Sequence, residues 1–280
     1  MGPATAPTSP IVCLDFDGTL VDDRGRIHPA DVEILANERS VAFVPATGRP
    51  LHSVRRAFER HGLFSGRPIP FPLVLENGAA IYGERENLRS RRSLQPELRD
   101  ELLRAALSAN GANFLLHSLD EARTLGSNGL LRAFVRRFDL DARPWDPDSE
   151  PAGSWGRPLV KLVVTAQDPE AVGRFEAETA DLPLERTYSL PNMLELGPAG
   201  VHKGSGLAAL LDYTGHAPRE VVVAGDGEND LALFEMATLR FAPADSPPAI
   251  RARADRILDV REEGLLAPIL REIGRRATGA

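Results

Sequence analysis

IVCLDFDGTL, residues 11–20, decides the fold of this 280-residue chain. The apolar run predicts a buried strand from Ile11 to Asp15, and two carboxylates, Asp15 and Asp17, leave its end together. Side chains two residues apart on a strand point to the same side, so both carboxylates should face one pocket. Gly18 allows a sharp turn that brings backbone N–H groups close to a ligand. Paired acids at the carboxyl end of a strand indicate a metal-assisted site for an anionic substrate, although Asp-Gly alone would suit an ordinary turn.

A second strand-end motif is VAFVPATGR, residues 41–49, in which an apolar strand ends in a hydroxyl, a glycine and a cation. Thr47 can hydrogen-bond a phosphate oxygen, and Gly48 permits close approach of the backbone. The alternative is that Thr47 caps the helix that follows Pro50. Because this motif comes after Asp15 and Asp17, the phosphate-binding interpretation is favoured.

Lys203 is one of only two lysines, the other being Lys161, in a chain with 33 Lys and Arg residues. A lysine kept against this arginine bias indicates a site that needs a compact ammonium, which the planar guanidinium group cannot replace. The alternative is a solvated charge at the start of a helix. The helix dipole disfavours a cation at that position, so the alternative is weak.

The last motif is GDGEND, residues 225–230, which follows the apolar strand 221–224. Asp226 stands at a strand end, as Asp15 does, and Asp230 lies four residues later, one turn into the next helix. Both side chains can therefore face the same site. Capping of that helix by Asp226 is the alternative, but the density of acids exceeds what a cap requires.

These four motifs, in this order, resemble those of the haloacid dehalogenase-like (HAD) superfamily of phosphohydrolases. The resemblance extends roughly from Ile11 to the C-terminal helix. It implies that Asp15 is the nucleophile, that Asp17 is the general acid and base, and that Thr47 and Lys203 hold the phosphoryl group. It also implies Mg²⁺ as the cofactor, a hard cation that prefers oxygen ligands. The implied metal site comprises Asp15, the backbone carbonyl of Asp17, Asp226 and, through water, Asn229 or Asp230.

Composition narrows the class of protein. The chain is 42% hydrophobic and 26% charged, which is ordinary for a globular protein, and its length suggests a core with a second, inserted or appended unit. A net charge of −7 gives no sign of a nucleic-acid-binding face, and no apolar run is long enough to span a membrane. The single cysteine, Cys13, is expected in the core and fits a reducing, cytoplasmic location. Residues 1–10 are expected to form a flexible tail, and the oligomeric state is not indicated.

Apolar strands separated by amphipathic helices predict an α/β core, a Rossmann-like parallel sheet with helices on both faces. We expect this core to comprise residues 11–82 and 190–280. Ligands of such sheets bind at the carboxyl ends of the strands, where Asp15, Thr47 and Asp226 all fall. The expected strands are 11–15, 41–46, 73–75 and 221–224, and the expected helices are 31–37, 51–61, 204–213, 230–236 and 264–275.

Residues 83–189 are predicted to form an inserted α+β unit, hinged near Tyr82 and Pro191. Its position and composition resemble the large cap of the Cof-type, or subfamily IIB, members, as does Glu76-Asn77-Gly78-Ala79 before it. Such a cap would close over the Asp15 site, exclude water and select the substrate. Asp245 stands where this group commonly has Asn. The insert is expected to contain helices 95–109, 128–138 and 169–180, strands 113–117, 159–165 and 184–189, and a loop at 141–158. The candidate substrate-binding residues are Gly18, Gly48, Arg49, Asn77, Lys161 and Asn192.

Together the motifs favour a Mg²⁺-dependent phosphatase of small phosphorylated metabolites, with sugar phosphates or similar polyol phosphates as expected substrates. The alternatives are a phosphosugar mutase with the same nucleophile and a non-catalytic phosphometabolite-binding module. A mutase would isomerise its substrate, and a binding module would turn over no phosphoester. Neither nucleic acid nor a membrane is an expected partner.

Overall fold

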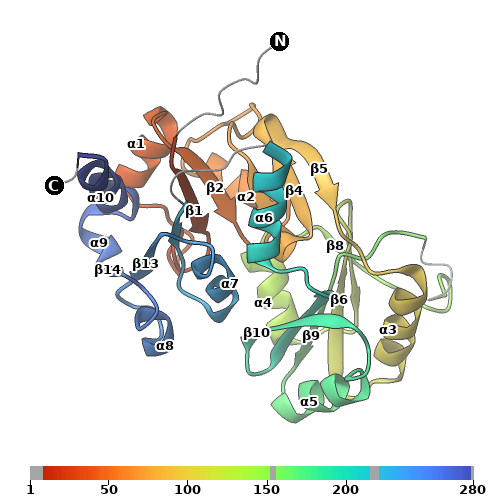
Figure 1. Cartoon of the computed structure of the whole chain (residues 1–280). Coiled ribbons are helices and arrows are strands. Elements are labelled where there is room, and N and C mark those ends of the chain that lie inside the picture. Colours follow the sequence, from red (N-terminus) through yellow and green to blue (C-terminus); the bar gives the residue numbers. More distant parts are fainter. Residues whose placement is uncertain (1–8, 152–155, 215–220, 279–280) are drawn as a thin grey trace. The chain divides into compact units, whose positions relative to one another are not determined.

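The computed structural model describes residues 9–151, 156–214 and 221–278. The chain divides into two compact units (Figure 1). Unit 1 contains Met1–Ser90 and His202–Ala280, and unit 2 contains Arg91–Val201. Most of the tail predicted at residues 1–10 lies outside the described residues. Within the described part of the chain, no helix combines the length and apolar character needed to cross a membrane.

Unit 1 is built on an eight-stranded sheet in the order β14-β13-β12-β1-β2-β3-β4-β5. The strands from β14 to β3 are parallel, which confirms the predicted Rossmann-like core, and β4 is an antiparallel addition beside β3. In register, Asp15 lies beside Ala46 of β2, and Leu14 lies beside Ala224 of β12. The ends of β1, β2 and β12 therefore meet at one edge of the sheet. The strands are β1 (Ile11–Asp15), β2 (Ala42–Ala46), β3 (Leu73–Leu75), β4 (Ala80–Gly83), β5 (Asn87–Arg91), β12 (Val221–Ala224), β13 (Leu239–Pro243) and β14 (Arg256–Leu258).

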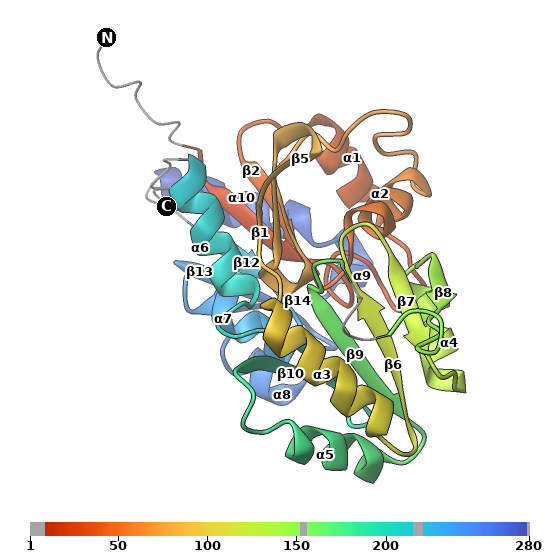
Figure 2. The same cartoon turned by 90° about the vertical axis from the view of Figure 1, so that its right-hand side faces the viewer.

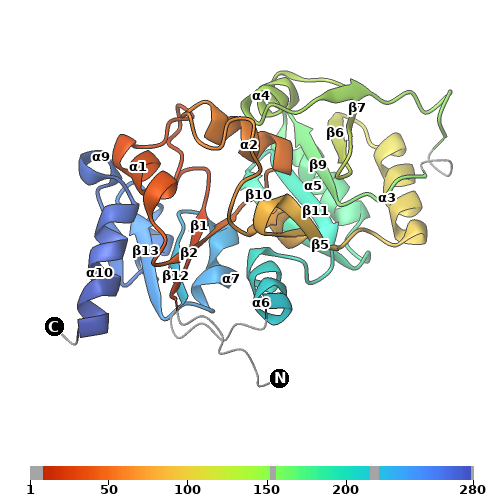
Figure 3. The same ribbon diagram turned by 90° about the horizontal axis from the view of Figure 1, so that it is seen from above.

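Helices cover both faces of this sheet (Figure 3). On one face, Cys13 and Val223 pack in an apolar cluster with residues of α6 and α7. On the other, Phe43 of β2 and Phe58 of α2 both meet Phe71 edge to face. Burial on both faces is the reason these strands read as continuous apolar runs. The helices of unit 1 are α1 (Pro29–Asn37), α2 (Leu51–Glu59), α6 (Lys203–Thr214), α7 (Leu231–Phe234), α8 (Pro248–Arg251), α9 (Val260–Glu263) and α10 (Leu266–Thr278).

A buried carboxylate joins the first and last helices of unit 1. Asp31 of α1 is 2% exposed, and its two oxygens accept hydrogen bonds from the backbone N–H groups of Leu265 (2.9 Å) and Leu266 (2.7 Å). These N–H groups begin α10 and have no partner within that helix. The carboxylate therefore caps α10 from a distant part of the chain.

Unit 2 is an α+β unit on a six-stranded sheet in the order β10-β11-β9-β6-β7-β8 (Figure 2). All neighbouring strands are antiparallel except β7 and β8. Residues of α3 and α5 pack with Phe114 and Leu162 on one face, and residues of α4 pack with Leu115 and Val163 on the other. The elements are α3 (Pro96–Ser108), β6 (Ala112–His117), β7 (Ala122–Leu125), α4 (Gly129–Arg137), β8 (Ala142–Pro144), β9 (Lys161–Ala166), α5 (Pro169–Glu178), β10 (Leu184–Leu190) and β11 (Met193–Pro198).

Both ends of unit 2 lie later in the chain than the predicted boundaries at 83 and 189. At the first end, β5 still belongs to the sheet of unit 1. At the second, β11 pairs with β10 and β9, so Pro191 lies in a hairpin turn and not at a hinge. A Pro-Asn pair suits both a hairpin turn and a hinge between units, and the sequence alone does not distinguish the two. The stretch 141–158, expected to be a loop, contains the short strand β8, and its residues 152–155 lie outside the described residues.

Candidate active site

The loop after β1 lies directly against the strand-end acid of β12. Asp15 is buried, and the chain turns immediately after it, with Gly18 N donating to Val21 O at 2.8 Å and Val21 N donating to Phe16 O at 2.7 Å. Gly18 has a φ of +89°, and a Cβ at this position would overlap the carboxylate of Asp226. The Asp-Gly pair is thus a turn whose glycine makes room for a second acid.

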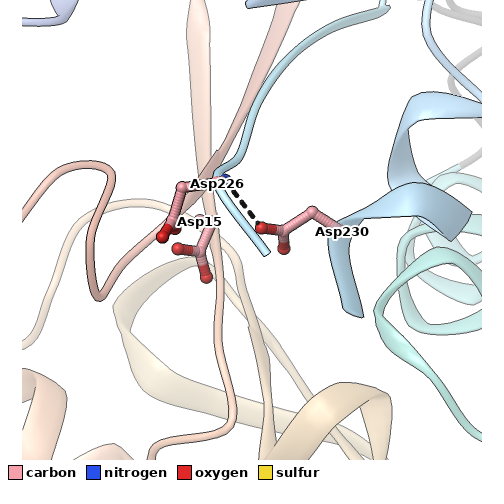
Figure 4. A group of neighbouring side chains, drawn as sticks. All are labelled: Asp15, Asp226 and Asp230. Carbon is pink, nitrogen blue, oxygen red and sulfur yellow. Dashed lines mark hydrogen bonds between the residues drawn. The ribbon is translucent and has the colours of Figure 1, made fainter. Parts of the chain in front are cut away.

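Three carboxylates converge at the carboxyl ends of β1 and β12 (Figure 4). One oxygen each of Asp15, Asp226 and Asp230 lies within 4.8 Å of the others. Asp230 Oδ2 accepts hydrogen bonds from the backbone N–H groups of Asp226 and Gly227, both at 3.0 Å. Asp230, rather than Asp226, therefore satisfies the N–H groups of this turn. The Asp226 carboxylate accepts instead from Thr19 Oγ1 at 2.8 Å.

Lys203 reaches this cluster from the first position of α6. Its side chain is 2% exposed, and Nζ donates to Asp15 Oδ1 at 2.5 Å and to Asp230 Oδ1 at 2.6 Å. The residue before it, His202, accepts a hydrogen bond at Nδ1 from Ser205 N, at 3.2 Å, at the start of the helix. Lys203 is therefore not a solvated helix-start charge, and the compact ammonium lies between two buried acids.

The charges of this cluster do not balance. Three carboxylates and one ammonium leave two negative charges in a site that is mostly shielded from water. Burial, and next the charge of Asp230, raise the pKa of Asp15 well above its usual value, although Lys203 opposes them. Burial is also the largest cause that raises the pKa of Asp226. Burial lowers the pKa of Lys203, but Asp15 and Asp230 outweigh it and raise the pKa, so the amine carries its proton.

The acid cluster fits a hard divalent cation. Its donors are carboxylate oxygens, the ligands that such cations prefer. Two positive charges would also offset the excess negative charge left by the three acids and Lys203. The soft or borderline metals that favour thiolate or imidazole would find no such ligands among Asp15, Asp226 and Asp230.

The Thr47 motif is held by a strained turn after β3. Thr47 is buried, its Oγ1 accepts from Arg49 N at 3.2 Å, and Pro50 occupies the N-cap of α2, so Thr47 is not the helix cap. Asn77 N donates to Thr47 O at 3.0 Å, and the Asn77 side chain lies against Gly48. Glu76 and Asn77 both have a φ of +54°, the left-handed region. Such residues cost about 1–3 kcal/mol each and are kept where surrounding structure enforces them.

Arg49 lies against Asp17. Its Nε donates to Asp17 Oδ2 at 2.7 Å, its Nη2 donates to Asp17 Oδ1 at 2.6 Å, and its Nη1 donates to Ser53 Oγ at 3.2 Å. The Arg49 side chain is 3% exposed, and that of Asp17 is 22% exposed. Sequence reasoning assigned Arg49 to the substrate and did not anticipate this pair.

The remaining candidates lie in several places. Asn229 is half-buried in the turn before Asp230, and Asp245 is exposed, 3.5 Å from Arg261. Lys161 and Asn192 belong to unit 2, where Lys161 Nζ lies 3.2 Å from Glu195 Oε2.

Thr19 was missed as a site residue, although it directly follows Gly18 in the first motif. Its hydroxyl orients Asp226 and so helps to shape the acid cluster. Cys13 is fully buried, and burial raises the pKa of its thiol, in agreement with the predicted core role.

Comparison with known proteins identifies the family of this chain. The family model of the haloacid dehalogenase-like hydrolases matches residues 12–270. The chain belongs to this family. It is 24% identical over 267 residues to the pyridoxal phosphate phosphatase YbhA of Escherichia coli, covering 90% of this chain and 93% of YbhA. It is 27% identical over 265 residues to the phosphoglycolate phosphatase of Methanopyrus kandleri, covering 94% and 96% of the two chains.

The fold of this HAD hydrolase is also found in a solved structure. The HAD subclass IIB sugar phosphatase BT4131 superposes with a TM-score of 0.76 and 18% identity, covering 95% of this chain and 99% of that one. The core with an α+β insert expected for Cof-type, subfamily IIB members is therefore confirmed.

Proposed function

We propose that this HAD hydrolase is a Mg²⁺-dependent phosphatase that hydrolyses small phosphorylated metabolites through an aspartyl-phosphate on Asp15. The observation that carries the proposal is the buried Asp15 carboxylate at the end of β1, with Lys203 Nζ at 2.5 Å and two further acids beside it. Its relatives act on phosphomonoesters of differing chemistry, so the family does not name the substrate. Sugar phosphates and similar polyol phosphates are the substrates we favour.

The residues of the site support a reaction in two steps. A carboxylate oxygen of Asp15 attacks phosphorus while the bond to the leaving oxygen breaks, and Asp17 gives that oxygen a proton. Water then attacks the aspartyl-phosphate and passes a proton to Asp17, and the bond between phosphorus and Asp15 breaks to release phosphate. Thr47 and Lys203 hold the phosphoryl oxygens and stabilise the charge that develops on them.

The cation would be held by the acid cluster. Asp15, the backbone carbonyl of Asp17 and Asp226 would bind Mg²⁺, with Asp230 or Asn229 acting through water. When bound, the ion neutralises charge on the phosphoryl oxygens. The fit rests on the all-oxygen donors and on the excess negative charge of the cluster.

We also propose that unit 2 is a cap that selects the substrate. It is inserted between β5 and α6 and has its own sheet and apolar core. Lys161 is the candidate for recognition of the substrate's non-reacting part. Lys161→Ala should change the relative kcat/KM for different phosphoesters more than it changes the Mg²⁺ concentration for half activity; the reverse would count against this role.

A screen of phosphorylated metabolites tests the proposed function. Wild-type protein with Mg²⁺ should release inorganic phosphate from at least one small phosphoester, and Asp15→Asn should release none. Isomerised substrate without released phosphate would instead show a mutase. No turnover of any phosphoester would leave a binding module and refute the proposal.

A further inference from the structure

We propose that Arg49 is a positioning residue that fixes the carboxylate of Asp17 in the orientation needed for proton exchange with the leaving oxygen. This inference rests on the proposed function, because it takes Asp17 as the general acid and base. It replaces the expectation that Arg49 binds the non-reacting part of the substrate.

The contact between the two side chains is a fork-to-fork pair. Arg49 Nε and Nη2 reach different oxygens of Asp17, at 2.7 and 2.6 Å. Two parallel, charge-assisted hydrogen bonds fix both the position and the plane of a carboxylate. The Asp17 carboxylate cannot rotate about its Cβ–Cγ bond without breaking both of them.

Arg49 is itself held on the side away from Asp17. Its Nη1 donates to Ser53 Oγ, a fully buried hydroxyl on α2. Its Cζ lies 5.1 Å from the ring centroid of Phe16, the residue between the two catalytic acids, within the range of cation–π attraction. Phe16 in turn meets Phe58 of α2 edge to face, at 5.5 Å. The guanidinium is therefore an element of a packed core rather than a group extended toward solvent.

Proton exchange remains possible while the pair is intact. Each carboxylate oxygen has two lone pairs, so an oxygen that accepts from Arg49 can still meet the leaving group or water. The Asp17 side chain keeps 22% exposure, whereas that of Arg49 has 3%. The accessible member of the pair is thus the acid, and the buried member is its support.

The leaving group distinguishes positioning from substrate binding. The alkoxide leaving from an alkyl phosphate needs a proton as it departs, whereas the stabilised phenolate from p-nitrophenyl phosphate needs one much less. General acid catalysis is typically worth about 10²–10⁴-fold. Loss of the support for Asp17 should therefore reduce kcat/KM strongly on an alkyl phosphate and weakly on the aryl phosphate, because kcat/KM reports the steps up to departure of the leaving group.

The experiment compares Arg49→Ala and Arg49→Lys with wild type on p-nitrophenyl phosphate and on the best alkyl phosphate found for the protein. Arg49→Ala should lose at least about tenfold more in kcat/KM on the alkyl ester than on the aryl ester. Added guanidine should restore part of this loss. Arg49→Lys should fall between, because one ammonium cannot reproduce a bidentate fork. Arg56→Ala, which removes an exposed arginine of α2, the helix that follows Arg49, is the matched control and should leave kcat/KM unchanged on both esters.

Equal losses of kcat/KM on the two esters would overturn the inference while leaving the proposed function intact. A rise in KM of the same size on both esters at unchanged kcat would overturn it too, since that is the pattern of lost substrate binding. If far-UV circular dichroism shows that Arg49→Ala does not fold, the same ratio measured on Arg49→Lys decides. Asp17→Asn alone should lose more kcat/KM on the alkyl ester than on the aryl ester. The double variant with Arg49→Lys should lose little more kcat/KM on the alkyl ester than Asp17→Asn does. Additive losses from the two substitutions would contradict coupling between Arg49 and Asp17. Failure of wild type to hydrolyse either ester would instead refute the proposed function, and the inference with it.

Discussion

Replacing Lys203 with Met should both destabilise the protein and abolish its activity. Met keeps an unbranched apolar stem but lacks the ammonium that lies 2.5 Å from Asp15 Oδ1 and 2.6 Å from Asp230 Oδ1. Removing one member of a buried ionic network costs about 3–5 kcal/mol, because the remaining charges lose their compensation. The raised pKa of Asp15 lets a proton replace part of that compensation, so we expect the lower end, about 3 kcal/mol, at neutral pH.

The assay is thermal unfolding in EDTA followed by far-UV circular dichroism, with kcat/KM measured in Mg²⁺. A change of 1 kcal/mol moves the midpoint by about 2–4 °C in a domain of 150–250 residues, so the midpoint should fall by roughly 6–12 °C. Lys203→Arg keeps the charge but overfills the site, and kcat/KM should fall at least about tenfold. Arg253→Met, which removes an exposed cation of unit 1, is the control. A midpoint within about 1 °C of wild type, with unchanged kcat/KM in Lys203→Met, would refute the reasoning.

The buried acidic residues lead to three further predictions. Phosphate release should require Mg²⁺ and stop in EDTA; full activity in the chelator would contradict an all-oxygen metal site. Mg²⁺ should raise the unfolding midpoint more at pH 8 than at pH 5. Because the pKa of Asp15 is raised, the metal-free folded protein holds the carboxyl proton of Asp15 more tightly than the unfolded chain does. The metal-free folded protein therefore loses stability as the pH rises above about 4. Over the same range Mg²⁺ meets less competition from protons for the Asp15 carboxylate, so its stabilising effect grows. An equal effect of Mg²⁺ at the two pH values would speak against this coupling. Asp31→Ala should lower the free energy of unfolding by about 1–2 kcal/mol in urea titrations, because it removes the cap of α10, and Asp31→Asn should lose less; no change in either would show that the cap is dispensable.

Sequence reasoning located the central strands because each joins an apolar run to a chemical signature. The expected strands at 11–15, 73–75 and 221–224 have the bounds observed for β1, β3 and β12. The strands at the margins carry no such signal. β5, with the sequence NLRSR, is polar and mostly exposed, and it is a strand only because a neighbouring strand offers hydrogen bonds. Pairing of this kind depends on tertiary context, which local composition does not report.

A residue of the candidate site could be predicted from the sequence where its type and its place after a strand end are enough to put it there. The sequence brings Asp15 and Asp226 to one edge because parallel strands share their carboxyl ends, and Lys203 reaches them from the start of α6. The sequence does not indicate which acidic side chain or ligand an arginine such as Arg49 will contact. The orientation of Arg49 depends on packing against Phe16 and Ser53, which come from separate elements, and so its pairing with Asp17 emerges only in the folded chain.

The covalent intermediate offers the most direct test of the central claim. Wild-type protein mixed with Mg²⁺ and an excess of a good substrate, then quenched in acid during turnover, should carry one phosphoryl group on the peptide that contains Asp15, as detected by mass spectrometry. Asp15→Asn, whose amide is close to isosteric but is not a nucleophile, should fold normally, carry no phosphoryl group and lose several orders of magnitude in activity. A phosphoryl group on a different residue, or turnover by Asp15→Asn within about tenfold of wild type, would contradict the assignment of Asp15 as the nucleophile.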